Sequence, residues 1–203
     1  MPHVLLLNNL SYLRQDDSFS RLNITKETFK TLVYECGIFA EFAEYVVDFR
    51  WKMKESEVGP PPIRFRLFDQ PHPAYDTFPS GIDVSRSQVY IECAYGVRHA
   101  EFTKRPAEDD DDEKPPPFSL RQLSVYQKYV PKSNAPCSTW VLVGQSQRTE
   151  KCLDQYVNGD DQVMGAHTFE LHIIFLDAAI ASWRPYLAHL LEEESQVVSL
   201  TLK

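Results

Sequence analysis

The sequence predicts an α+β fold in which a mainly antiparallel sheet is covered by N-terminal helices and by a long C-terminal amphipathic helix. Three observations support this class. Apolar and polar residues alternate in the middle of the chain, as in half-buried strands. Apolar residues recur at helical spacing before and after this region. The 203 residues are 43% hydrophobic and 25% charged, which is typical of one globular domain spanning 1–203.

Two short helices are expected near the N-terminus. Thr25 can cap the first, and Gly37 suits the position after its end, where a left-handed backbone favours glycine. The first helix should bury Phe29, Leu32, Val33 and Cys36. The second should bury Phe39, Phe42, Ala43, Val46 and Val47, with Phe49 as a further candidate.

Four strands are expected, over about 63–68, 87–103, 119–130 and 139–144. Three prolines at 60–62 precede the first, which reads as a short edge strand. Gly96 in the second suggests a bulge or a tight bend. The run from Trp140 to Val143 is continuously apolar, as in a strand buried on both faces.

Residues 105–117 are expected to form a flexible loop within the domain. Six consecutive acidic residues, 108–113, are followed by prolines at 115–117. Like charges repel and prolines oppose regular structure. The net charge of the chain is −8, and this run supplies most of it. Hard cations prefer carboxylates, but a flexible acidic run lacks the fixed geometry that confers affinity.

The C-terminal part predicts a long helix with a narrow apolar seam. Its members follow one another at alternating steps of four and three residues, a period of 3.5. Such a seam suits association with another helix, but a helix lying on a sheet looks nearly the same, and we favour this second reading. Pro185 should kink the helix, and the acids at 192–194 should either end it or lie within a longer one. The seam consists of Phe169, Ile173, Leu176, Ile180, Trp183, Leu187 and Leu190.

Several classes of function are not expected. The chain lacks GxSxG, GxxxxGK, GxGxxG and HExxH, and we expect no catalytic residues and no cofactor. His167 and His172 are five residues apart, which puts them on different helix faces and disfavours a shared metal. A Cys–His pair that meets in space stays open, because such partners need not be close in sequence. Clustered basic residues are missing, so nucleic-acid binding is not expected.

The cellular setting is expected to be cytoplasmic. Four cysteines lie far apart without a CxxC pair, as in reduced cytosolic proteins. The first residues lack the basic region of a signal peptide. No apolar stretch reaches the roughly 18 residues of a membrane span.

Arg98, Glu101 and Arg121 form a charged set in or beside the expected strands. Charges in such positions usually have partners. We expect a structural salt-bridge cluster that joins two neighbouring strands, and the alternative is a polar site lined by the same residues.

Three segments, 94–101, 118–129 and 183–187, resemble the soluble N-terminal domain of fungal CorA-like, magnesium-transporter-like proteins. That family has the patterns Y-x-x-R-x-x-E, P-x-S-x-R-Q-x-x-V-Y and W-R-x-Y-L in this order. The resemblance covers roughly residues 20 to 190. The matching residues are Tyr95, Arg98, Glu101, Ser119, Arg121, Gln122, Tyr126, Trp183 and Arg184.

The resemblance implies a cytosolic domain and a long helix that leads into two membrane spans, with stalk helices associated around a symmetry axis. The Gly-Met-Asn signature of the family's pore is missing from these 203 residues. We therefore expect a non-catalytic regulatory or oligomerisation domain of a divalent metal-ion transporter, which self-associates through its C-terminal helix and is membrane-associated only in a longer form. The alternative is a free-standing protein-interaction module that uses the same seam. The resemblance assigns no metal site to this chain.

Overall fold

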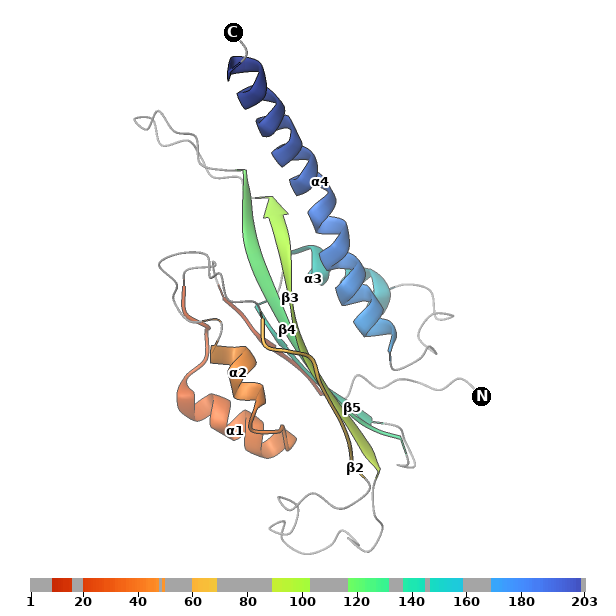
Figure 1. Ribbon diagram of the computed structural model, residues 1–203. Coiled ribbons are helices and arrows are strands. Elements are labelled where there is room, and N and C mark those ends of the chain that lie inside the picture. The colour runs from red at the N-terminus through yellow and green to blue at the C-terminus, as the bar shows by residue number, and fades with distance from the viewer. Residues whose placement is uncertain are drawn as a thin grey trace, which may run out of the picture.

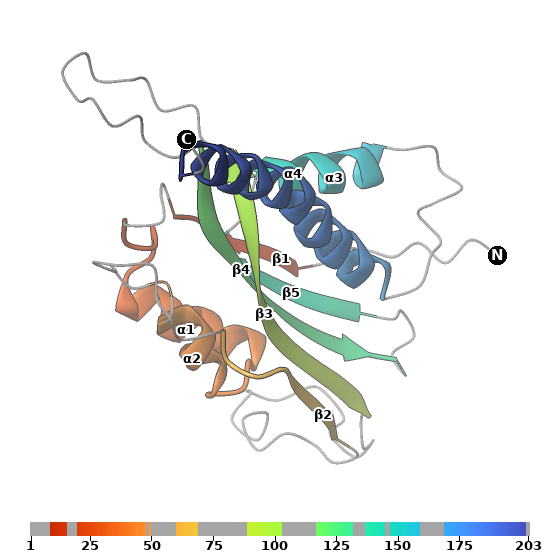
Figure 2. The ribbon, with the colours of Figure 1, turned by 45° about the horizontal axis from the view of Figure 1, so that its top comes forward.

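The computed structural model describes residues 9–15, 20–47, 49, 60–68, 89–102, 117–131, 137–144, 147–158 and 169–201. A five-stranded sheet lies between two helical layers, with α1 and α2 on one face and α3 and α4 on the other (Figures 1 and 2). This confirms the predicted α+β class. The expected loop at 105–117 falls outside the described residues except for Pro117.

The strand order is β1-β5-β4-β3-β2. β1 pairs with β5 in parallel, and the other neighbours pair antiparallel. The four predicted strands are confirmed, and β2 lies at the edge as expected. The bounds are β1 Asn9–Leu13, β2 Arg64–Phe68, β3 Tyr90–Phe102, β4 Phe118–Val130 and β5 Cys137–Val143.

The first helix has the predicted ends. α1 spans Lys26–Cys36, and the Thr28 amide donates to the Thr25 hydroxyl oxygen at 3.1 Å. Gly37 follows with φ 55°, and its N–H bonds back to the last turn of the helix. α2 spans Phe42–Val47.

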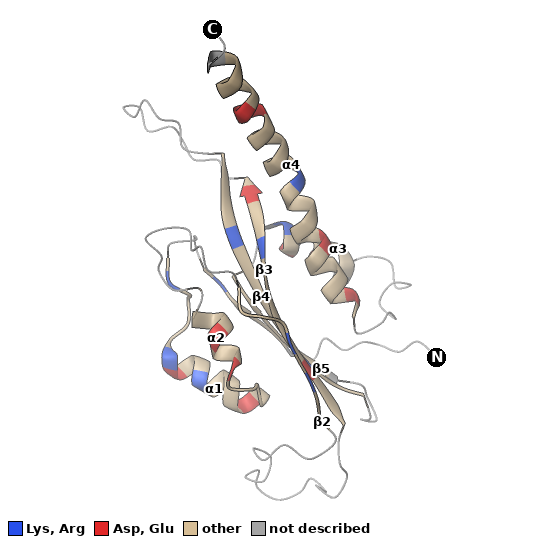
Figure 3. Cartoon of the chain, in the orientation of Figure 1, with Lys and Arg blue, Asp and Glu red and all other residues tan. Residues whose placement is uncertain are grey.

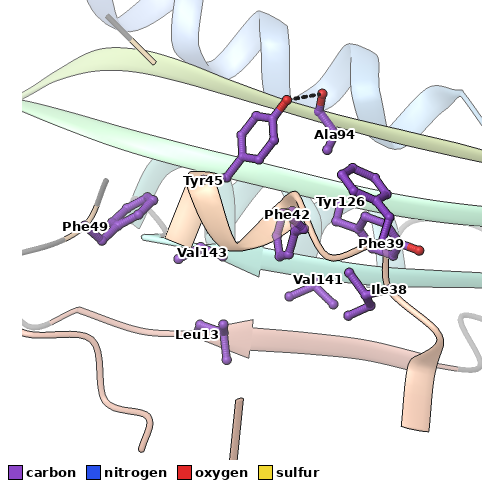
Figure 4. Close-up of a cluster of buried hydrophobic side chains, with 10 residues drawn as sticks. All are labelled: Leu13, Ile38, Phe39, Phe42, Tyr45, Phe49, Ala94, Tyr126, Val141 and Val143. Atoms are coloured by element: carbon purple, nitrogen blue, oxygen red, sulfur yellow. Dashed lines mark hydrogen bonds between the residues drawn. The ribbon is translucent and has the colours of Figure 1, made fainter. Parts of the chain in front are cut away.

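One core lies between α2 and the sheet (Figure 4). Phe42 and Tyr45 of α2 are fully buried. The single proton of the Tyr45 hydroxyl is shared between the Pro62 carbonyl and the Ala94 carbonyl, which lies 3.3 Å away. The expectation that Val47 is buried is wrong, since it is 62% exposed. Residues three positions apart lie on the same side of a helix, so Tyr45 shares the buried side of Phe42. Val47 therefore lies on the outer side. The cluster is completed by Leu13, Ile38, Phe39, Phe49, Ala94, Tyr126, Val141 and Val143.

Gly96 does not mark a bulge. It pairs with Ser124 in an uninterrupted register between β3 and β4. A Cβ at this position would lie 2.8 Å from the Cβ of Pro60. The glycine therefore lets the proline segment that precedes β2 cross close to the sheet.

A second core lies under α3 (Gln147–Asn158) and α4 (Glu170–Thr201). Trp140 and Leu142 of β5 point into it, whereas Val141 and Val143 point into the first core. The prediction that this strand is buried on both faces is confirmed. α4 is one helix that continues through Pro185 and past the acids at 192–194. Of the two expectations, that these acids end the helix or lie within a longer one, the second is therefore correct.

Candidate functional site

The seam of α4 points mainly into solvent. Six of its seven residues are exposed, and Ile173, Ile180 and Leu187 are 65%, 70% and 52% exposed. The favoured reading, in which the seam packs on the sheet, is therefore wrong. α4 does lie on the sheet, but with another side, which includes Leu171, Phe175, Ala178, Ala179 and Ser182.

The exposed apolar surface continues beyond the predicted seam. Leu191, Val197 and Val198 are exposed and project in the same general direction, since all these residues fall within about 120° of the helix circumference at 100° per residue. Figure 1 shows the end of α4 extending past the ends of β3 and β4. We call this surface the outer face of α4: Phe169, Ile173, Leu176, Ile180, Leu187, Leu190, Leu191, Val197 and Val198.

The outer face is large for a monomer. Its nine residues are each 40% to 70% exposed. With about 200 Å² for a large apolar side chain, they present roughly 1,000 Å². The largest apolar patch of a typical monomer is about 300–600 Å². Most of α4 carries no charge (Figure 3). Such a surface can bind apolar protein surface.

A buried hydrogen-bonded chain attaches the first half of α4 to the sheet. The Tyr95 hydroxyl lies 2.9 Å from His172 Nδ1, and His172 Nε2 lies 2.7 Å from Gln127 Oε1. Burial lowers the pKa of His172 to about 4 and raises the pKa of Tyr95. The imidazole is therefore neutral at pH 7, with its proton on Nε2 facing the amide oxygen and Nδ1 accepting from the tyrosine.

The Trp183 side chain provides a second attachment. Its Nε1 donates to the backbone carbonyl of Arg98 at 3.0 Å. One turn later, the Tyr186 ring meets Phe118 of β4, with centroids 5.6 Å apart. The hydrogen bond between Trp183 and Arg98 brings together two of the motif residues that are 85 positions apart in sequence. Arg184, the motif residue next to Trp183, is exposed.

Glu101 and Arg121, two of the three residues of the predicted cluster, form an ion pair between neighbouring strands. Arg121 Nε lies 3.3 Å from Glu101 Oε2, and both side chains are partly buried. His99 lies in register with Arg121, and burial, with a smaller effect of the Arg121 charge, lowers its pKa to about 4. Arg98 starts from the opposite face of β3, because alternate residues of a strand point to opposite sides.

The motif residues thus lie on both faces of the sheet. Ser119 pairs in register with Glu101, and Gln122 pairs with Arg98. Tyr126 lies in the first core, where its hydroxyl donates to Glu92 at 2.7 Å. Most of these residues have structural contacts, and they do not converge on one pocket.

Sequence reasoning missed a buried charged row beneath α2. Glu92 is 1% exposed and pairs in register with Arg66 of β2 and Lys128 of β4. Lys128 Nζ donates to the Gly37 carbonyl at 3.4 Å, which ties the end of α1 to the sheet. All three charged residues lie in strands, which the sequence does indicate. The sequence does not show that they lie opposite one another in neighbouring strands.

The described part of the chain contains no group of three or more His, Cys, Asp or Glu side chains placed to hold a metal ion. His167 lies outside the described residues. No helix among the described residues combines the length and the hydropathy required to cross a bilayer.

Comparisons with known proteins agree with the motifs. Neither the search of curated proteins nor the search of solved structures found a match. A family model described as CorA-like transporters matches residues 9–202, which include β1 to β5 and all four helices. The chain therefore belongs to the family of CorA-like transporters.

Proposed function

We propose that this chain is a non-catalytic cytosolic domain of a CorA-like divalent metal-ion transporter, and that it assembles with copies of itself through the outer face of α4. The roughly 1,000 Å² of exposed apolar surface is the observation that carries the proposal. A standard protein–protein interface buries about 800 Å² per partner, so this one face is large enough for a stable complex.

The spacing of the seam supports self-association. A period of 3.5 residues keeps the same side of a helix turned toward a partner helix over its whole length. α4 has 32 residues and is therefore roughly 48 Å long. The resemblance to CorA-like proteins, which implies stalk helices associated around a symmetry axis, supports the same arrangement of these helices.

The attachments of α4 to the sheet support a regulatory role. The chain of Tyr95, His172 and Gln127 and the bond from Trp183 fix the first half of the helix on β3 and β4. A rearrangement of the domain would therefore be transmitted to the assembled helices.

The test is the mass of the 203-residue chain in solution by sedimentation equilibrium. We expect the wild type to form a discrete oligomer. The Ile180→Asp/Leu187→Asp variant should be a monomer that still unfolds cooperatively in urea, because both side chains are exposed. Ala188→Asp is the matched control on an exposed position of α4 outside the outer face, and it should leave the oligomer intact.

Two results would contradict the proposal. A wild type that stays monomeric at about 100 μM would favour the alternative, a free-standing module that binds the helix of a different protein. A double variant that unfolds would show that the outer face is part of the core.

A further inference from the structure

Glu194 lies within the outer face of α4, near the C-terminal end of this face. The alternating steps of four and three that define the seam lead from Leu190 to Glu194 and then to Val197. On the helix circumference Glu194 points within about 20° of the direction of Leu187. It is the one charged residue at a position of this series between Phe169 and Val197.

The immediate neighbours of Glu194 are all apolar. Residues three and four positions away on a helix are adjacent on its surface. For Glu194 these are Leu190, Leu191, Val197 and Val198, which are 40% to 63% exposed. The other acids of this run differ: Glu193 lies 3.2 Å from His189, and Glu192 points well away from the outer face.

We propose that Glu194 is the residue that determines the specificity of the assembly and limits its strength. This inference rests on the proposed function. In copies related by a rotation axis parallel to α4, the carboxylates meet at one level of the seam, surrounded by Leu190, Leu191, Val197 and Val198. A single polar residue at a core position of a coiled coil fixes register and oligomer state at a cost in stability. Here the cost arises because like charges are brought together and lose water.

This role explains why an otherwise apolar face contains a single acid. Without it, the same apolar surface would match many registers and either orientation of a partner helix. With it, only symmetric arrangements that tolerate the converging charges persist, and the last turns of α4 associate more weakly than the first.

The experiment compares three variants of the 203-residue chain by sedimentation equilibrium. Glu194→Gln removes the charge and keeps the shape, and Glu194→Leu also completes the apolar face. Glu192→Gln is the matched control, because it changes the net charge by the same amount outside this face. We expect Glu194→Gln to lower the dissociation constant at least tenfold, Glu194→Leu to lower it further, and Glu192→Gln to change it less than twofold.

Salt provides an independent readout. Charge repulsion is screened over about 10 Å at 0.1 M salt and about 3 Å at 1 M. Association of the wild type should therefore strengthen between 50 and 500 mM NaCl, and this dependence should be clearly smaller for Glu194→Gln than for Glu192→Gln.

The outcomes separate this inference from the proposed function. If Ile180→Asp/Leu187→Asp disperses the wild-type oligomer while Glu194→Gln behaves like Glu192→Gln, the assembly stands and the role of Glu194 is refuted. If Glu194→Gln weakens association, the carboxylate makes a favourable contact, and the role is also refuted. If the wild type and all variants are monomers, both proposals fail.

Discussion

Lowering the pH from 7 to 5 tests the packing around His172, the histidine of α4 that lies between Tyr95 and Gln127. The His172 side chain also contacts the Trp140 ring, with centroids 4.8 Å apart, so water has little access to it. Burial lowers its pKa to about 4, against an ordinary value of about 6.5. Between these two values the unfolded chain binds a proton that the folded chain does not bind.

The sign and size of the effect follow from this difference. The contribution of the neutral imidazole to stability is complete above about pH 6.5 and is lost as the pH falls toward 4. The full difference corresponds to roughly 3 kcal/mol, because a tenfold change in an acidity constant is worth about 1.4 kcal/mol. From pH 7 to pH 5 the expected loss from His172 is about 2 kcal/mol.

Urea denaturation at pH 7, 6 and 5 measures this loss for the wild type and for His172→Gln, whose amide cannot ionise. The variant should lose about 2 kcal/mol less than the wild type over this range. His99→Gln should show a reduction of similar size, because the pKa of His99 is also about 4. An unchanged pH dependence in His172→Gln would refute the argument that this imidazole is neutral and buried in the folded chain.

Two further changes test the cores and the caps by the same denaturation measurement at pH 7. Phe175→Ala should lower the free energy of unfolding by about 3–5 kcal/mol, because the side chain is fully buried. Asp177→Ala, at an exposed position of α4 outside the outer face, should cost less than about 1 kcal/mol. Similar costs would mean that the buried side of α4 is assigned wrongly. Thr25→Ala should cost about 1 kcal/mol by removing the cap on the Thr28 amide, and Thr31→Ala, within the same helix, should cost clearly less; a Thr25→Ala protein as stable as the wild type would contradict the capping role.

The parts of the fold with strong local signals were predictable from sequence. The cap at Thr25, the left-handed Gly37 and the alternation in β3 are each specified within a few residues. The bridge between Glu101 and Arg121 was predictable as well, because semi-buried charges on adjacent strands need partners.

The elements that depend on distant partners were not predicted. β1 has five residues and pairs in parallel with β5, which lies about 130 positions later. α3 is a mainly polar helix in which Leu153 is buried, so its helical pattern of apolar residues is sparse.

The side by which α4 lies on the sheet was misjudged for a physical reason. Its large residues form a regular series that dominates the pattern, but the contact with the sheet includes Ala178, Ala179 and Ser182. Small side chains let a helix approach closely, and they contribute little to a pattern of large apolar residues. The seam residues are therefore exposed, and the sheet uses a different side of the same helix.

The unequal surroundings of the two ends of α4 have a consequence for how the chain becomes ordered. A ring contact between His189 and Phe118 joins α4 to the sheet, and residues 190–199 are all exposed. A helical segment of about ten residues without burial is only marginally stable in water. If copies of the chain assemble as proposed, burial of this segment stabilises its helix, and part of the binding free energy is used to order these residues.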